Sequence, residues 1–217
     1  MQAEALGFDA GERRLVEIGA SRTLLHADPS EASALFASQG AIVCPDVFEP
    51  ALLERLLDGC RSAQFVADKG NLLGTRQLEQ PMRIGRAISF LLERSNFLRW
   101  IEAATGRGSF DRVVGKVVQT RAGSGDALKW HDDMRDESRR ALGITINLTD
   151  FAYTGGQFEM RNVGDRSSLR RFHHQCAGTA LIFAVDRGRV HRLTPLESGG
   201  PRRVYTGWFL YGPGSAT

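Results

Sequence analysis

The spacing of hydrophobic residues along the chain changes near residue 112. Before that point the spacing is helical: in residues 50–60 the leucines recur at i, i+3 and i+4, and Pro50 suits a first helical turn. A similar pattern covers about residues 85–104, and a further helix is expected to start near Ser30. The first half of the chain is therefore predicted to be mainly helical, apart from a short apolar run at residues 40–48.

The second half carries short β-type runs bounded by Gly, Pro, Asp or Asn, at residues 113–120, 143–149, 156–160, 178–185 and 202–210. Several short strands in succession favour a sandwich or barrel, and no internal repeat is evident. We expect a mainly β fold with flanking helices, of the α+β class. Residues 1–38 are expected to form an N-terminal arm or helix, and residues 39–217 one domain with its strand core at about 112–212.

Composition narrows the class of protein. The 217 residues are 42% hydrophobic and 24% charged, which is typical of a globular protein. No apolar stretch approaches the roughly 20 residues that a membrane crossing needs, and residues 1–9 do not resemble a secretory signal. We expect a cytoplasmic protein without a membrane partner; the sequence does not indicate an oligomeric state.

Charge and cysteine content give no indication of a nucleic-acid site or of a disulfide framework. The net charge is +3, and the basic residues, 25 Arg and three Lys, are interleaved with acidic ones, so nucleic-acid binding is not indicated. Cys44, Cys60 and Cys176 are far apart and lack CxxC spacing. They are expected to be buried, reduced thiols.

The sequence Trp130-His131-Asp132-Asp133 contains an HxD triplet. In an extended chain alternate side chains point to the same side, so His131 and Asp133 could bind one metal ion while Asp132 faces away. His191, which follows the apolar run at residues 180–185, is the third candidate ligand. Two imidazoles and one carboxylate on one face of Fe(II) leave three positions open, although zinc catalysis also uses such ligands.

Arg202 lies beyond the last histidine and begins an apparent strand in which Val204, Thr206 and Trp208 share its face. A buried guanidinium makes a two-pronged contact with a carboxylate, so Arg202 is suited to the distal end of 2-oxoglutarate. Thr206 is predicted to shape the same pocket. Trp208 and Trp130 are candidates for the substrate pocket, or else for the core.

The order of these motifs resembles the 2-oxoglutarate/Fe(II) dioxygenases of the prolyl-4-hydroxylase type. The likeness rests on the HxD triplet, residues 153–160 and 178–183, His191 and Arg202, and covers about residues 113–210. It implies a double-stranded β-helix (a jelly-roll, as in cupins) with supporting helices. It also implies Fe(II), 2-oxoglutarate and O2, with ascorbate as a candidate reductant. The activity implied is hydroxylation of a C–H bond in a peptidyl residue such as proline, or in a small molecule, with release of succinate and CO2.

One departure from the family concerns the co-substrate pocket. Family members often carry a tyrosine on the strand before the HxD triplet that helps to hold 2-oxoglutarate, and here Arg121 is nearest to that position. Arg121 is therefore a candidate co-substrate ligand. Two alternatives on the same fold stay open: a zinc-dependent hydrolase, and a jelly-roll metal-binding module without oxygen chemistry.

Overall fold

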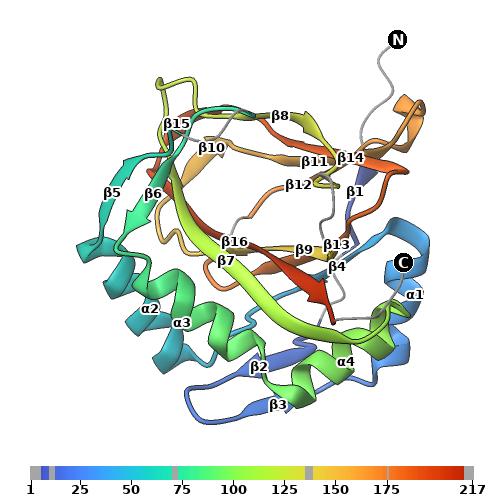
Figure 1. Cartoon of the computed structure of the whole chain (residues 1–217). Coiled ribbons are helices and arrows are strands. Elements are labelled where there is room, and N and C mark those ends of the chain that lie inside the picture. Colours follow the sequence, from blue (N-terminus) through green and yellow to red (C-terminus); the bar gives the residue numbers. More distant parts are fainter. Residues whose placement is uncertain (1–5, 10–12, 70–72, 135–138, 175, 213–217) are drawn as a thin grey trace.

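The computed structural model describes residues 6–9, 13–69, 73–134, 139–174 and 176–212, and in them two β-sheets face each other (Figure 1). The larger sheet has the order β4-β13-β9-β16-β7-β6-β5 and the smaller one β1-β12-β11-β14-β8. The strands of the larger sheet are β4 (Ala41–Cys44), β5 (Gln64–Ala67), β6 (Gln77–Gln80), β7 (Phe110–Thr120), β9 (Arg140–Asn147), β13 (Ala180–Ala184) and β16 (Arg202–Tyr211). Those of the smaller sheet are β1 (Leu6–Gly7), β8 (Leu128–His131), β11 (Phe158–Asn162), β12 (Arg170–Phe172) and β14 (Arg189–Leu193). The predicted jelly-roll is confirmed.

Two short strand pairs and a 3-10 helix complete the β part. The strand β10 (Tyr153–Gly155) pairs with β15 (Leu196–Gly199), and β2 (Val16–Ile18) pairs with β3 (Thr23–Leu25). The 3-10 helix η1 covers Arg166–Ser168.

The helices support the larger sheet from its outer face (Figure 1). They are α1 (Pro29–Gln39), α2 (Pro50–Ser62), α3 (Arg83–Leu92) and α4 (Ser95–Thr105). The apolar faces of α2, α3 and α4 join the outward side chains of β7, β9 and β16 in the main hydrophobic core. None of the described helices is long and apolar enough to span a membrane.

The helical pattern at residues 85–104 is divided into two helices, because Arg94 has an extended backbone between them. Its guanidinium donates to the carbonyl oxygens of Gly19 and Ala20 in the turn between β2 and β3. The prediction of helix at residues 50–60 is confirmed by α2. The expectation of three buried thiols is wrong for Cys176, which is exposed; Cys44 and Cys60 are buried.

The strand β16 is central to the site because it pairs with β7 on one side and β9 on the other. Its register places Arg202 opposite Thr120 of β7, and Thr206 between Lys116 of β7 and Thr145 of β9. Alternate residues of these strands therefore line the space between the sheets.

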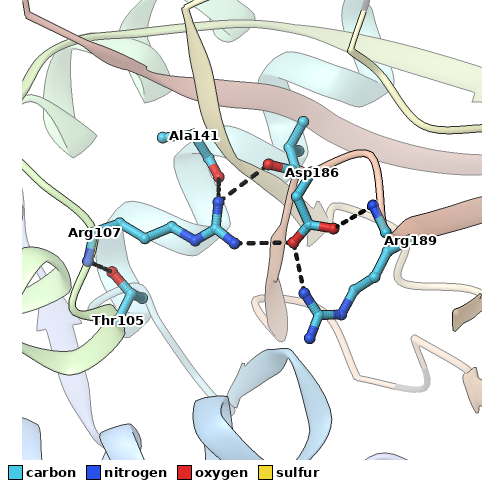
Figure 2. Close-up of polar contacts among 7 residues, drawn as sticks. Thr105, Arg107, Ala141, Asp186 and Arg189 are labelled. Carbon is cyan, nitrogen blue, oxygen red and sulfur yellow. Dashed lines mark hydrogen bonds and ion pairs between the residues drawn. The ribbon is translucent and has the colours of Figure 1, made fainter. Parts of the chain in front are cut away.

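The turn between β13 and β14 is held by a polar cluster that includes the carboxylate of Asp186 (Figure 2). Arg107, just after α4, donates to this carboxylate at 3.0 Å and to the carbonyl oxygens of Ala141 and Val185 at 3.1 Å each. Arg189 donates to the same carboxylate at 2.6 Å. The start of β14, the strand that carries His191, is thereby tied to the larger sheet.

Candidate metal centre

His131 and His191 lie opposite each other on the antiparallel strands β8 and β14. Their ring centroids are 4.2 Å apart. With Asp133 they form a group whose potential ligand atoms all lie within 4.8 Å of one another. His191 Nε2 is 3.3 Å from Asp133 Oδ2, and His131 Nε2 is 3.6 Å from Asp133 Oδ1. These three residues could hold one metal ion.

The backbone conformation that brings Asp133 to the site differs from the prediction. The triplet was expected to be extended, but β8 ends at His131 and Asp133 has a left-handed backbone with φ of 60°. This conformation is uncommon for a residue with a Cβ, although Asp adopts it more readily than most, and such residues cluster at functional sites. The carboxylate still faces the two imidazoles, because a bend replaces the alternation of a strand.

Neighbouring groups orient the three side chains. His131 Nδ1 lies 2.6 Å from the Lys129 carbonyl oxygen, to which it donates, so Nε2 presents its lone pair to the site. The indole N–H of Trp208 donates to Asp133 Oδ2 at 2.8 Å. Arg140 donates to the backbone carbonyl of Asp133 at 3.1 Å, and its guanidinium carbon lies 3.9 Å from the centroid of the Trp208 ring.

Electrostatics favour the ionised form of the Asp133 carboxylate and the neutral form of the His131 imidazole. Burial opposes ionisation of Asp133, but the hydrogen bond and charge of His191, with the Trp208 N–H and His131, outweigh burial and hold the pKa of Asp133 well below its usual value. Burial, and then the charge of His191, lower the pKa of His131. An anionic carboxylate and a neutral imidazole are the forms that bind a divalent metal.

A cavity of about 320 Å³ extends from the three residues into the space between the sheets. Arg202, Thr206 and Trp208 line it, as does Thr120. The Arg202 side chain is buried, with 3% of the residue exposed. Its Nε and the hydroxyl of Thr120 are buried without a hydrogen-bond partner among the described residues. Buried polar atoms of this kind are costly unless a ligand satisfies them.

Two other candidate residues lie outside this cavity. Arg121 is exposed and is not part of the cavity lining. Trp130 is on the outer side of the smaller sheet, where Arg161 and Arg192 lie over its ring at 4.5 and 4.9 Å from the centroid. The structure therefore brings neither residue to the pocket for which it was a candidate.

Sequence reasoning missed several residues that line the cavity or support it. Thr120, one position before Arg121, has its side chain on the cavity face of β7. Thr145 lines the cavity too, and its hydroxyl lies 2.8 Å from Nε2 of the buried His174. The alternation of β7 could have distinguished Thr120 from Arg121, but no sequence signal connects Thr145 with His174.

Comparisons with known proteins agree with this geometry. The sequence model of the 2OG-Fe(II) oxygenase superfamily matches residues 116–210. A comparison with curated proteins gives no significant match. The resemblance predicted from the sequence is confirmed over residues 116–210, which match the 2OG-Fe(II) oxygenase superfamily, and this match supports an enzyme of the oxygenase class. The cofactors of that superfamily are Fe(II), 2-oxoglutarate and O2.

Solved structures share the fold. A 2OG-Fe(II) oxygenase family oxidoreductase from Burkholderia pseudomallei is 16% identical with a TM-score of 0.65, over 95% of each chain. A Pseudomonas putida prolyl-4-hydroxylase is 18% identical with a TM-score of 0.66, over 86% of this chain and 100% of that one. A Trichoplax adhaerens prolyl hydroxylase, solved with a hypoxia inducible factor peptide, is 15% identical with a TM-score of 0.63, over 84% and 88% of the two chains.

Proposed function

We propose that this protein is an Fe(II)- and 2-oxoglutarate-dependent dioxygenase that hydroxylates a C–H bond and releases succinate and CO2. The observation that carries the proposal is one cavity with two different ends. Two histidines and a carboxylate converge at one end, and a buried arginine with an unpartnered Nε lies in the other. A metal ion and a dicarboxylate would satisfy the two ends together.

In this proposal His131, Asp133 and His191 hold the iron. Two imidazoles and one carboxylate suit Fe(II) and leave positions for a chelating co-substrate and dioxygen. Bound iron would supply the oxidising chemistry. The protein's part is to fix its ligands: the Lys129 carbonyl sets the ring of His131, and the Trp208 N–H sets the carboxylate of Asp133.

Arg202 and Thr120 would bind the distal carboxylate of 2-oxoglutarate. A guanidinium and a hydroxyl side by side can donate to two carboxylate oxygens at once, and burial strengthens such charge-assisted bonds. Thr206 lies on the same face of β16 and borders the path toward the metal. No cavity-facing tyrosine is needed in this arrangement.

The substrate is proposed to be a small molecule or a peptidyl residue. Two proteins of the same fold are prolyl hydroxylases by name, which makes hydroxylation the form of oxidation that we propose. Ascorbate is proposed as an auxiliary reductant.

The test is an anaerobic titration of metal-free protein with Fe(II) and then 2-oxoglutarate, following the visible metal-to-ligand charge-transfer band. We expect the band in the wild type and in His26→Ala, which removes an exposed histidine remote from the cavity. His131→Ala should lack it, because one metal ligand is lost. Tight metal binding by the wild type without any band would overturn the proposal and favour zinc hydrolysis or a binding module.

A further inference from the structure

One wall of the cavity is cationic in a way that the metal and 2-oxoglutarate do not explain. Arg76, Lys116 and Arg140 line it, and Asp68 is the carboxylate among them. We call Arg76, Lys116 and Arg140 the cationic wall. In the part of the chain that the structure describes, Asp68 is the only carboxylate that pairs with Arg76 or Lys116.

The side chains of the cationic wall are held in place by ion pairs and burial and are not mobile chains on the surface. Asp68 Oδ2 accepts from Arg76 Nε at 2.9 Å and lies 3.5 Å from Lys116 Nζ. The side chains of Asp68 and Arg76 are only 11% and 13% exposed, and that of Lys116 is 25% exposed. Three charged groups at this depth have lost most of their hydration, which is costly unless each is paired.

The hairpin of β5 and β6 holds Arg76 beside the metal ligands. Asp68 and Arg76 face each other where the connecting loop leaves the two strands, and the Asp68 N–H donates to the Arg76 carbonyl there at 2.9 Å. Farther along, the Lys129 N–H donates to the Leu73 carbonyl at 2.9 Å, two residues before His131. Gly74 fits so closely there that a Cβ would lie 1.8 Å from the Ala127 oxygen. Arg76 is therefore anchored to the strand that carries His131.

A count of formal charges shows that the cationic wall has too few carboxylates to balance its positive charge. In the loaded site, Fe(II) and Arg202 would balance Asp133 and the two carboxylates of 2-oxoglutarate. Arg192 is already paired with Glu159 at 2.6 Å. Among the described lining residues this leaves the three cations of the wall against the single carboxylate of Asp68. Such a wall attracts an anion and repels a cation.

Building on the proposed function, we propose that the substrate is a small organic acid whose carboxylate binds to Arg76 and Lys116. Arg76 uses Nε for Asp68, and no hydrogen bond from its terminal nitrogens to another described residue is found, so these nitrogens can bind a second carboxylate. Lys116 adds a point charge beside them. Asp68 orients both cations. The cavity volume of about 320 Å³, shared with 2-oxoglutarate, suits a small acid.

The test uses Mn(II)-loaded protein saturated with 2-oxoglutarate, to which small carboxylic acids of three to six carbons, or their neutral amides, are added. Relaxation of the ligand protons by Mn(II) reports binding near the metal without any turnover. We expect at least one acid to bind about tenfold or more tightly than its amide, because each charge-assisted contact contributes about that factor. Arg76→Gln and Lys116→Gln should each remove the preference.

Arg112→Gln is the matched control, since it removes an exposed positive charge on β7 outside the cavity and should change nothing. The proposal fails if no acid is preferred over its amide, if the two variants keep the preference, or if only an acidic peptide binds. The charge-transfer band with Fe(II) and 2-oxoglutarate separates the two proposals. A wild type without the band refutes the proposed function, and a band lost in Arg76→Gln or Lys116→Gln would assign these cations to the co-substrate instead.

Discussion

The guanidinium of Arg202 is buried beside Thr120 with its Nε unpartnered, and this makes co-substrate affinity sensitive to its shape as well as its charge. We expect Arg202→Lys to weaken 2-oxoglutarate binding about 10- to 100-fold, because an ammonium keeps the charge but cannot make the two-pronged contact. The measurement is the Kd from the charge-transfer titration.

A shorter keto acid provides the control for this variant. The affinity of 2-oxobutyrate, which lacks the distal carboxylate, should be nearly the same in wild type and Arg202→Lys. Equal losses for both keto acids would mean that the substitution disturbs the metal centre and not a carboxylate site.

The indole of Trp208 is expected to matter for metal affinity. Trp208→Phe keeps most of the ring but removes the N–H that donates to Asp133 Oδ2 at 2.8 Å. Loss of such a partner of a metal ligand typically costs about 10- to 100-fold in metal affinity. Titration with Mn(II) or Co(II) would measure it.

Trp130→Phe is the matched control, because Trp130 stacks with arginines on the outer side of the smaller sheet. It should leave metal affinity within about twofold of the wild type. If both variants lose affinity equally, the Asp133 hydrogen bond is not the cause.

For single residues, the sequence predicted which side chains form the site better than it predicted their backbone conformation. His131, Asp133 and His191 were selected by motif and converge in the structure, yet the extended triplet from which Asp133 was chosen is absent. The preference for Arg121 over Thr120 shows a second limit. The strand β7 ends at Thr120, which pairs with β16 and lines the cavity, whereas Arg121 follows the strand and is exposed.

Among the elements, the β13–β14 turn should depend on Asp186. Its carboxylate accepts hydrogen bonds from Arg107 and Arg189 (Figure 2) and also from the Gly188 N–H at 3.0 Å. Asp186→Ala removes all three bonds, and because the site is partly exposed we expect a loss of about 1–2 kcal/mol in the free energy of unfolding. Urea denaturation followed by circular dichroism would measure it.

Asp186→Asn separates the two kinds of contact. The amide oxygen can still accept from Gly188 but lacks the charge for the arginines, so the loss should be smaller than for alanine. Equal stability of Asp186→Ala and wild type would show that the cluster contributes nothing to stability.

Elements with a buried face were predicted well, and exposed ones were not. The helix α2 and the strands β7 and β16 have clear periodicity because one side packs in the core. The strands β5 and β6 lie in a stretch that is mostly exposed or half-buried. Because this stretch is polar and interrupted by Gly and Pro, it has no hydrophobic alternation from which the strands could be predicted. Their hairpin carries Asp68 and Arg76, which is why the cationic wall could not be predicted.

For the whole molecule, the placement of the described α-helices in the first half of the chain was predictable, since it follows from the change in hydrophobic spacing. The strands β1 to β6, which also lie in that half, were not part of that prediction apart from the apolar run at residues 40–48. The pairing of β4 with β13 was not predictable: it adds a strand from between α1 and α2 to the edge of the larger sheet. Contacts so distant in sequence leave no local pattern.

Stability of the whole molecule should fall as pH decreases through the range in which histidine titrates. His174 is 1% exposed, and burial, then the charges of Arg202 and His173, lower its pKa well below the ordinary value of 6.5. The folded protein therefore keeps His174 neutral at a pH where the unfolded chain, with a pKa of roughly 6.5, takes up a proton. Stability from this residue is complete above that pKa and is lost as the pH falls below it.

Urea denaturation of metal-free protein at several pH values between 8 and 5 would measure the effect, with His174→Gln as the comparison. The glutamine amide can still bond with the Thr145 hydroxyl but does not titrate. We expect the wild type to lose stability more steeply below pH 6.5, by up to about 1.4 kcal/mol per pH unit from this one proton. The variant keeps the contributions of the other histidines, so only the difference in slope belongs to His174, and parallel slopes would show that His174 takes up its proton equally in both states.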